Sequence, residues 1–569
     1  MWLLSPSKIE SPKNRIKFVE IIKIIFISDL LSIRKSDMIQ KGELHASTMV
    51  VGGERDMPAR IHPRTHEIGE IVSFLNAPSG GFAYVRGRRR VGKSWILRKV
   101  TERCAGRVIF YTGKKDLQPK ATLREFAMQF DEFAGGILGL ARHDVPKLSE
   151  FNSEALTWER VFHAFAQLAA AKRSRDGEKS TSLALFFDEI QWVASKSTGI
   201  IGALKSTWDA LKEQNIKIIL CGSSNKFFEE HTGDHEKTLR GLKTHADIWV
   251  LPLTLAQTRA AFFPNWTLQE AAVVQMCFGG IPYYLENIPN NTSFVLAINE
   301  AAFLRRSLFL EEAHEILALD FNAQRRERAL HIIEMIPAQG CGLDTLVRRT
   351  GFPQSNVSEI VEVLERYGFV SKRPLPSKGK RGGQMQLVRL ADQFLMFYAA
   401  VLAPRREAIS ANNTSRNIFA TCIGAKLDNY YIADFTGSAF ELLVENELAV
   451  GTCEHNPANW PKIYARLGLT PAIAGGGYKI QSDVREEGSQ IDLLIIDSAA
   501  RLAHLIECKW GREDIQWINL LCDKPIPPKI PDGISLTRSI VCGYPTSSAF
   551  KSRAAAEKIA VVSLEELVG

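Results

Sequence analysis

One short segment of the sequence combines two glycines, a lysine and a serine at the spacing GxxxxGKS. Its residues are Gly87, Arg88, Arg89, Arg90, Val91, Gly92, Lys93 and Ser94. The glycines let the backbone curl so that its N–H groups point at phosphate oxygens. Lys93 can then reach the β- and γ-phosphates of a nucleotide, and Ser94 can offer its hydroxyl to Mg²⁺. These residue types at this spacing predict a site for ATP and Mg²⁺.

The residues on either side of this segment predict the elements that position it. An apolar strand is expected at 82–85 and a helix from Trp95 onward. The loop therefore lies between a strand end and a helix N-terminus, whose positive dipole end favours bound phosphate. This is the context that a phosphate-binding loop requires.

A second predicted strand supplies acidic groups. The apolar run 183–187 ends in Asp188 and Glu189. Asp188 would hold Mg²⁺ through water, and Glu189 would orient or deprotonate the attacking water. A buried strand followed by a solvated acidic turn also explains this segment when it is taken alone. Its pairing with the upstream phosphate-binding loop favours the catalytic interpretation.

A third predicted strand, 216–224, runs into the polar residues Ser223, Ser224 and Asn225. A polar side chain here could sense the γ-phosphate, or the segment could be an ordinary turn. Further along, Arg240 and Lys243 could supply an arginine-finger-like charge, although lone basic residues are more often only solvated.

A second group of charged residues lies on two strands expected at 489–497 and 502–510. Strand alternation places Glu507 and Lys509 on the same face, and a hairpin would bring Asp492 beside Glu507. Asp492 and Glu507 would hold Mg²⁺ through hard oxygen ligands, and the metal would activate a bound water. Lys509 would position that water or stabilise the developing negative charge.

A helix expected at 435–451 carries Glu441, which would complete this second site. A helix glutamate, a strand aspartate and then Glu-x-Lys is the order of the PD-(D/E)XK nuclease core. Glu-x-Lys alone is very common. The charges could therefore also be a remnant of such a fold, or each could pair with other surface groups.

Residues 321–392 predict helices at 323–338, 342–351 and 352–370, followed by two strands around a basic turn. This is the order of a winged helix-turn-helix. Basic residues that could contact DNA phosphates concentrate here: Arg348, Arg349, Lys372, Arg373, Lys378, Lys380 and Arg381. Gln354, Ser355 and Asn356 could touch base edges. DNA is the expected partner, although winged helices also serve as protein–protein modules.

Four segments resemble, in this order, the archaeal-type AAA+ family of signalling-type P-loop ATPases. They are GRRRVGKS (87–94), FFDEIQW (186–192), CGSS (221–224) and GGIPYYL (279–285). The resemblance implies a helical lid containing 279–285, then a winged helix, then a nuclease-like domain of unknown function. The family usually has a Gly-Arg pair before the last core strand, whereas this chain reads Gly241-Leu242-Lys243.

These observations predict an α/β fold with several domains, since 569 residues exceed what a single core supports. The expected domains are an N-terminal extension, a P-loop parallel-sheet ATPase core, a helical lid, a winged helix-turn-helix and a C-terminal α/β restriction-endonuclease-like domain. Their expected bounds are, in that order, 1–55, 56–253, 254–320, 321–392 and 393–569.

Composition restricts the class of protein further. The nine cysteines include no CxxC pair, which argues against a zinc module and fits a reducing cytoplasm. The net charge of +8 permits contact with an anionic polymer but does not require it. The apolar run 21–33 is interrupted by Lys23 and Asp29 and is too short to span a bilayer. An amphipathic helix is expected there, with no signal peptide and no membrane partner.

Two functions are therefore expected as alternatives. In the first, the chain hydrolyses ATP, binds DNA and cleaves it with Mg²⁺ in the C-terminal domain. In the second, it is an ATP-dependent switch or a transcriptional or signalling regulator whose nuclease-like domain does not cleave. Either could act as a homo-oligomer, because a finger residue often comes from a neighbouring copy.

Overall fold

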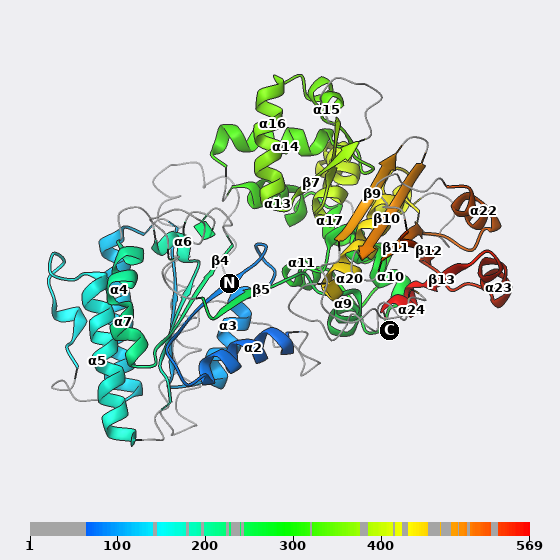
Figure 1. The fold of residues 1–569 in the computed structure, drawn as a ribbon. Coiled ribbons are helices and arrows are strands. Elements are labelled where there is room, and N and C mark those ends of the chain that lie inside the picture. The colour runs from blue at the N-terminus through cyan, green and yellow to red at the C-terminus, as the bar shows by residue number, and fades with distance from the viewer. Residues whose placement is uncertain are drawn as a thin grey trace, which may run out of the picture. The chain divides into compact units, whose positions relative to one another are not determined.

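A computed structural model of the chain describes residues 64–568 with gaps (Figure 1). The gaps are 116, 140–144, 178–180, 195–198, 224–226, 229–230, 232–238, 240–243, 319–320, 376–384, 413–415, 424–430, 453–466, 468–478, 487–488, 498–500 and 525–532. The extension predicted at 1–55 lies outside the described residues, as do Ser224, Asn225, Arg240 and Lys243.

The first sheet is parallel and has the strand order β2-β3-β4-β1-β5. Its strands are β1 (Gly81–Arg86), β2 (Val108–Thr112), β3 (Ala184–Asp188), β4 (Lys217–Gly222) and β5 (Ala246–Trp249). The strand before the phosphate-binding loop and the strand that ends in Asp188 are thus separated by one strand, β4. Because all strands run in one direction, their carboxyl ends meet at one edge of the sheet.

Helices cover both faces of this sheet (Figure 1). Side chains of β1 alternate: Ala83 and Val85 pack with α2 (Thr65–Asn76) and α3 (Lys93–Arg103), and Phe82 and Tyr84 pack with the opposite layer. That opposite layer consists of α4 (Pro119–Glu132), α5 (Trp158–Asp176) and α7 (Ile200–Glu213). A strand buried on both faces reads as a continuous apolar run, which is why its position was predictable.

A group of helices follows the sheet: α9 (Leu255–Phe262), α10 (Leu268–Phe278), α11 (Pro282–Glu286), α12 (Phe294–Ala302) and α13 (Leu308–Leu317). Two of them begin with a capping box, at Thr254 and at Thr267. Gly280 lies against the segment that enters this group, because a Cβ at that position would come within 2.0 Å of Leu253 O. Only glycine permits this close backbone approach.

Residues 323–390 form three helices and a small antiparallel sheet of order β6-β8-β7. The helices are α14 (Ala323–Met335), α15 (Leu343–Thr350) and α16 (Gln354–Arg366). The strands are β6 (Cys341–Gly342), β7 (Val370–Leu375) and β8 (Met385–Leu390). The three helices and two strands expected here are confirmed, and β6 is an additional short strand. Further helices follow: α17 (Gln393–Phe397), α18 (Arg406–Ser410) and α19 (Ile418–Cys422).

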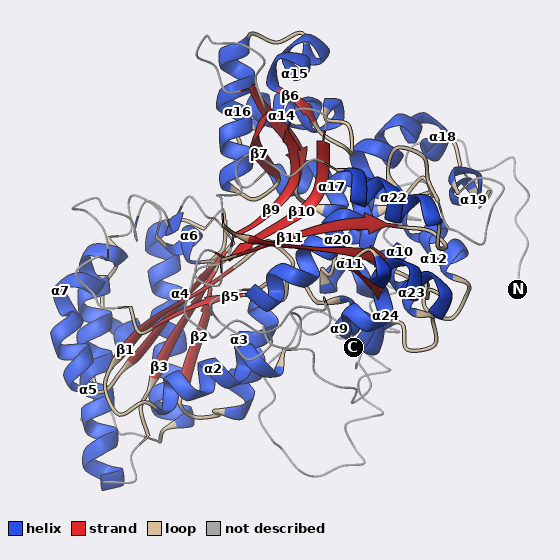
Figure 2. Cartoon of the chain, turned by 45° about the vertical axis from the view of Figure 1, so that its right-hand side comes forward, coloured by secondary structure: helices blue, strands red, loops and turns tan. Residues whose placement is uncertain are grey.

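The last part of the chain forms a mixed five-stranded sheet of order β13-β12-β11-β10-β9. Its elements are, in chain order, α20 (Thr436–Thr452), β9 (Lys479–Glu486), β10 (Ser489–Asp497), β11 (Leu502–Lys509), α22 (Ile515–Asp523), β12 (Ser535–Cys542), α23 (Ser548–Ala556), β13 (Ile559–Ser563) and α24 (Leu564–Val568). Strands β9, β10 and β11 form an antiparallel meander (Figure 2). Strands β11, β12 and β13 are parallel (Figure 1).

The helix expected at 435–451 is present as α20, in which Phe440, Leu443, Val444 and Leu448 are buried. Within the part of the chain that the structure describes, no helix is long and apolar enough to cross a bilayer.

Candidate nucleotide site and C-terminal acidic cluster

The segment 87–94 forms a tight loop that leads from β1 into the first turn of α3. Gly87 has φ 152° and Gly92 has φ 101°, backbone conformations that favour glycine. A Cβ at residue 87 would also come within 2.3 Å of Val250 O. Helix α3 begins at Lys93 with no side-chain cap. The N–H groups of its first turn are therefore available to an anion, as a phosphate-binding loop requires.

Lys93 is buried and turned back onto its own loop. Its Nζ donates to Gly87 O at 2.8 Å and to Arg88 O at 2.9 Å. Burial lowers the pKa of this ammonium, and the nearby Cys221, Glu189 and Asp188 oppose that shift. The predicted loop lysine and the predicted acids therefore lie in one electrostatic environment.

Asp188 is a buried carboxylate with an oxygen that is available to a ligand. Its side chain is 1% exposed, and its Oδ1 has no hydrogen-bond partner among the described residues. Buried carboxylate oxygens are almost always paired, so an unpaired one indicates a missing ion or water. Carboxylate and hydroxyl oxygens, such as those of Asp188 and Ser94, suit Mg²⁺, which retains several waters when it is bound with phosphates. The residues present therefore fit this metal.

Glu189 is held at the carboxyl edge of the sheet by two neighbours. Its backbone has φ 49°, an uncommon value for a residue other than glycine. Gln191 Nε2 donates to Glu189 Oε2, and Ser223 Oγ donates to the same oxygen at 3.3 Å. Ser223 at the end of β4 thus orients a predicted catalytic acid.

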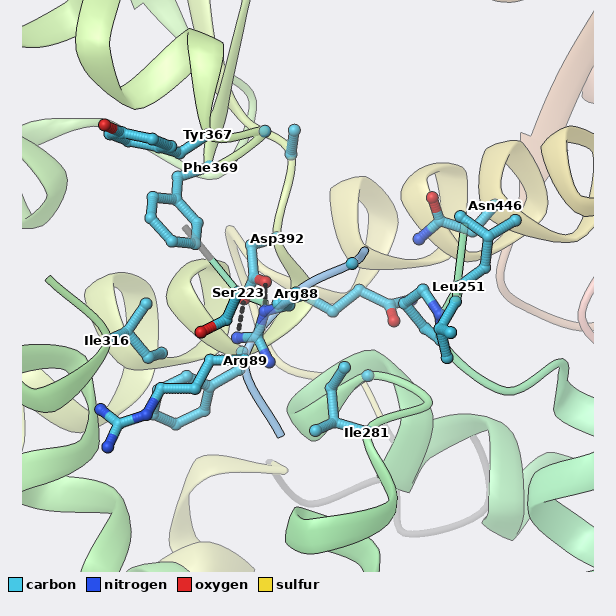
Figure 3. Close-up of a pocket in the computed structure, with 18 of the residues that line it drawn as sticks. Arg88, Arg89, Ser223, Leu251, Ile281, Ile316, Tyr367, Phe369, Asp392 and Asn446 are labelled. Carbon is cyan, nitrogen blue, oxygen red and sulfur yellow. Dashed lines mark hydrogen bonds and ion pairs between the residues drawn. The ribbon is translucent and has the colours of Figure 1, made fainter. Parts of the chain in front are cut away.

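The three arginines of the loop are paired with acidic residues far along the chain. Arg88 Nε lies 2.6 Å from Asp392 Oδ2, and its Nη2 donates to Asp392 Oδ1 at 3.1 Å (Figure 3). Arg89 Nη1 donates to the backbone oxygen of Glu315 at 2.7 Å, and Arg90 forms an ion pair with Glu312. The sequence predicts these arginines as part of the nucleotide site, and no sequence pattern indicates their acidic partners.

Glu312 is the most deeply buried of these partners. Tyr284 Oη donates to its Oε1 at 2.6 Å, and the Arg90 guanidinium lies 4.3 Å from the ring centre of Tyr283. Burial raises the pKa of Glu312, while Tyr284 and Arg90 counteract the shift. Both tyrosines belong to the GGIPYYL segment, so this motif connects the loop to α13.

A cavity of about 210 Å³ lies beside this loop. Arg88, Arg89 and Ser223 contribute to its wall (Figure 3). The other side is formed by residues that follow α16 and β8, among them Tyr367, Phe369, Ala391, Asp392, Gln393 and Phe394. The Arg88 side chain therefore has free space beside it.

The C-terminal charged residues come together as the strand pattern predicted. Lys509 Nζ lies 2.8 Å from Glu507 Oε2 and 3.7 Å from Asp492 Oδ2. The N–H of Cys508 donates to Asp492 Oδ2 at 2.8 Å. Asp492 and Glu507 are 5% and 3% exposed, so these charges are not surface groups. Burial and the neighbouring carboxylates of Glu441 and Glu507 raise the pKa of Asp492.

Two further basic residues, which sequence reasoning did not identify, join this cluster. Lys524 forms an ion pair with Glu507 Oε1. Arg389, at the end of β8, donates from Nη2 to Glu441 Oε2 at 2.9 Å and to Ser438 O at 2.9 Å. Within the described part of the chain, no three His, Cys, Asp or Glu side chains are placed to hold a metal ion together. Cations of the protein itself thus neutralise the carboxylates of the predicted C-terminal metal site.

The comparisons with known proteins agree with the first part of this description. Residues 62–288 match the family described as an ATPase domain predominantly from Archaea. This matched region, which includes the five-stranded parallel sheet, is therefore similar to ATPase domains of that family. An uncharacterized protein of Methanocaldococcus jannaschii is 21% identical over 350 residues, which are 61% of this chain and 70% of that protein.

Solved structures that match part of the chain include a Walker-type ATPase of Pyrococcus abyssi, at 18% identity and a TM-score of 0.42. That similarity covers 58% of this chain and 94% of the other. The ORC2 protein of Aeropyrum pernix, solved with ADPNP and ADP, is 12% identical with a TM-score of 0.37, covering 63% and 95%. Drosophila ORC bound to DNA is 11% identical with a TM-score of 0.25, covering 65% and 98%.

Proposed function

We propose that the chain binds ATP with Mg²⁺ at residues 87–94 and hydrolyses it. The observation that carries this proposal is the buried Asp188 carboxylate, with an unpaired oxygen, in the same environment as buried Lys93. An isolated lysine and aspartate would pair directly, whereas Lys93 donates to loop carbonyls and leaves Asp188 Oδ1 unbonded. A magnesium nucleotide would satisfy both groups.

Each residue then has a defined task. Lys93 would exchange its two carbonyl acceptors for phosphate oxygens, and the free N–H groups of α3 would bind the same phosphates. Ser94 and Asp188 would hold Mg²⁺, which when bound neutralises charge on the phosphates. Glu189 would orient or deprotonate the attacking water, in the position fixed by Gln191 and Ser223.

Titration of the full chain with a fluorescent ATP analogue and Mg²⁺ tests the nucleotide site. Lys93→Ala should weaken binding by about 100-fold or more, because it removes a charge-assisted contact to phosphate. Lys99→Ala is the matched control, since Lys99 lies in the same helix and forms an ion pair with Glu102 at the surface. Wild-type protein that binds no nucleotide would refute the proposal.

We further propose that residues 321–392 are a winged helix-turn-helix that binds DNA. Three helices and a small antiparallel sheet in this order support the fold. Gln354 and Ser355 are exposed in the first turn of α16, where they could reach base edges. Arg348 and Arg349 lie at the end of α15 and could contact phosphates. Lys372 already pairs with Glu365 at 2.7 Å, and Lys378, Lys380 and Arg381 lie outside the described residues.

For the C-terminal domain, 393–569, we propose a PD-(D/E)XK nuclease fold that cleaves DNA with Mg²⁺. The element order from α20 through β9, β10, β11, α22 and β12 supports the fold, and the contacts among Asp492, Glu507 and Lys509 support the site. Asp492 and Glu507 would hold the metal, which would activate water. Lys509 would stabilise the developing charge, and Glu441 would complete the site from α20.

The second candidate is an ATP-dependent switch or regulator that binds DNA without cutting it. The ion pairs of Glu507 with Lys509 and Lys524, and of Glu441 with Arg389, favour this alternative. Protein cations in these positions oppose the binding of a divalent ion.

Incubation of the full chain with DNA, ATP and Mg²⁺ or Mn²⁺ decides between the two. Metal-dependent scission that disappears in Asp492→Asn and Lys509→Ala would support the nuclease. Lys551→Ala, which changes a surface lysine of α23, is the control that should still cut. If wild type and both site variants leave DNA equally intact with every metal, the switch is the better description.

A further inference from the structure

One short segment contacts both candidate sites. Arg389 is the penultimate residue of β8, and Asp392 follows three residues later, immediately before α17. The first residue binds Glu441 of the C-terminal cluster, and the second binds Arg88 of the phosphate-binding loop. Only Leu390 and Ala391 lie between Arg389 and Asp392, so a movement at one of these two contacts is transmitted over a short stretch of backbone to the other.

The Arg389 contact is buried and specific. The Arg389 side chain is 2% exposed, and its Nη2 binds both Glu441 Oε2 and Ser438 O at 2.9 Å. Nε and Nη1 of the same guanidinium have no hydrogen-bond partner in the described residues. A buried guanidinium that is only half satisfied depends on its single carboxylate, so loss of Glu441 would leave an uncompensated charge.

The Asp392 contact reaches the nucleotide site directly. Asp392 binds Arg88 through both carboxylate oxygens, and its Oδ1 also accepts the N–H of Leu395 at the start of α17. Arg88 Nη1 is buried without a hydrogen-bond partner among the described residues, beside the cavity that borders the loop. The guanidinium of Arg88 lies 5.2 Å from the ring centre of Tyr284, and a phosphate bound at the loop could accept a hydrogen bond from its unpaired Nη1.

We propose that residues 389–392 couple the two sites, so that nucleotide binding regulates the C-terminal acidic cluster. When a phosphate draws Arg88 away from Asp392, the segment loses one of its two ionic anchors. Arg389 then loosens its hold on Glu441, which becomes available beside Asp492. This inference rests on the proposed nucleotide site and the proposed metal site, and assigns Arg389 and Asp392 as positioning residues.

Coupling between two sites is reciprocal, so changes at the C-terminal end must alter nucleotide affinity. We expect Glu441→Gln to tighten binding of a fluorescent ATP analogue by about fivefold, the lower end of ordinary coupling. Glu441 belongs to the C-terminal cluster, so a role confined to that cluster would leave nucleotide affinity unchanged. Asp392→Asn should also tighten binding, because it frees Arg88.

The decisive measurement is the double variant Asp392→Asn/Glu441→Gln in the full chain. If the segment is one relay, the double variant gains no more affinity than Asp392→Asn alone, because either change already breaks the relay. Glu445→Gln, one helical turn from Glu441, is the control and should bind as wild type does. Thermal unfolding of each variant shows whether it is folded. Arg389→Lys tests the contact between Arg389 and Glu441 by changing its basic partner.

The outcomes separate this inference from the proposals beneath it. Wild-type affinity in Glu441→Gln, or gains that multiply in the double variant, would overturn the relay while leaving the nucleotide site intact. Absence of nucleotide binding by the wild-type chain would overturn the nucleotide site and the relay together. Nucleotide coupling without DNA cleavage would keep the relay and assign it to a non-cleaving switch.

Discussion

The carboxylate of Glu447 in α20 accepts a 2.7 Å hydrogen bond from the backbone N–H of Leu255, the first residue of α9. This bond joins the helix of the acidic cluster to the helices that follow the ATPase sheet. Burial raises the pKa of Glu447 to about 7, although the bond from Leu255 acts in the opposite direction. The folded chain therefore favours the protonated form of this carboxyl group.

This relationship predicts a pH dependence of stability. The pKa of Glu447 in the folded chain is raised above its ordinary value of 4.5. Its stabilising contribution is therefore fully present at pH values below about 4.5. The contribution is lost as the pH rises through about 7. Glu447→Gln should remove this pH-dependent loss of unfolding free energy, which is roughly 1–3 kcal/mol. The variant should therefore be more stable than the wild-type protein at pH 8. Melting curves of both proteins from pH 5 to pH 8 check this; parallel curves would contradict it.

Glu189→Gln should separate nucleotide binding from hydrolysis. The amide keeps the shape of the side chain but cannot accept a proton, so hydrolysis should fall by about 10²–10⁴-fold while affinity for ATP is unchanged. Phosphate release and analogue binding measure the two quantities. Gln191→Ala should give a smaller loss, because it only removes a residue that orients Glu189. Full hydrolysis by Glu189→Gln would exclude Glu189 from the reaction.

Lys524→Met should strengthen divalent-ion binding at the C-terminal cluster. Lys524 neutralises Glu507, so its removal leaves a buried carboxylate short of positive charge. We expect Mn²⁺ affinity to rise about tenfold, equivalent to about 1.4 kcal/mol, in calorimetry without nucleotide. Lys551→Met is the surface control, and Asp492→Asn should abolish the heat signal. An unchanged affinity would mean that Glu507 does not bind the metal.

Arg348→Ala tests the proposed DNA contact. A phosphate contact carries no sequence information, so binding should weaken for all sequences alike. The slope of log affinity against log salt should decrease by about one. Arg553→Ala in α23 is a matched exposed control and should bind DNA as wild type does. Equal affinity and equal salt slope in both variants would place the DNA elsewhere or nowhere.

Gly280→Ala tests the backbone approach behind the GGIPYYL motif. The added methyl group would meet Leu253 O at 2.0 Å, and the 2.6 Å bond from Leu253 N to Gly280 O would be displaced. We expect a loss of roughly 1–3 kcal/mol in unfolding free energy. Gly202→Ala in α7 meets nothing within 4 Å and should stabilise by up to about 1 kcal/mol. Denaturant titration of both variants measures the contrast.

The local parts of both sites could be predicted from the sequence, and their long-range partners could not. The phosphate-binding loop has its lysine, glycines, strand and helix within a short stretch, so spacing alone predicts its geometry. Asp492 and Glu507 were placed together because side-chain alternation and a short turn fix a hairpin. Arg88 and Asp392, in contrast, are separated by 304 positions, and no local pattern connects them.

The unpredicted residues share a physical reason. Lys524 and Arg389 are single basic residues in segments where a solvated side chain is the ordinary expectation. Their roles follow only from tertiary packing, which buries Arg389 beside Glu441 and places the partly exposed Lys524 beside Glu507. The three arginines of the loop are predicted only as part of the nucleotide site, and no local pattern connects them with Asp392, Glu315 or Glu312.

The burial of Arg389 against α20 has a practical consequence for dividing the chain. A fragment beginning at residue 393 would keep Glu441 but lose Arg389, whose guanidinium pairs with it. A fragment ending at residue 392 would expose the Arg389 side chain, which is 2% exposed in the full chain. A boundary between residues 392 and 393, chosen from the sequence alone, would therefore yield fragments that lack this buried ion pair. Expression trials should retain β8 and α20 in the same polypeptide.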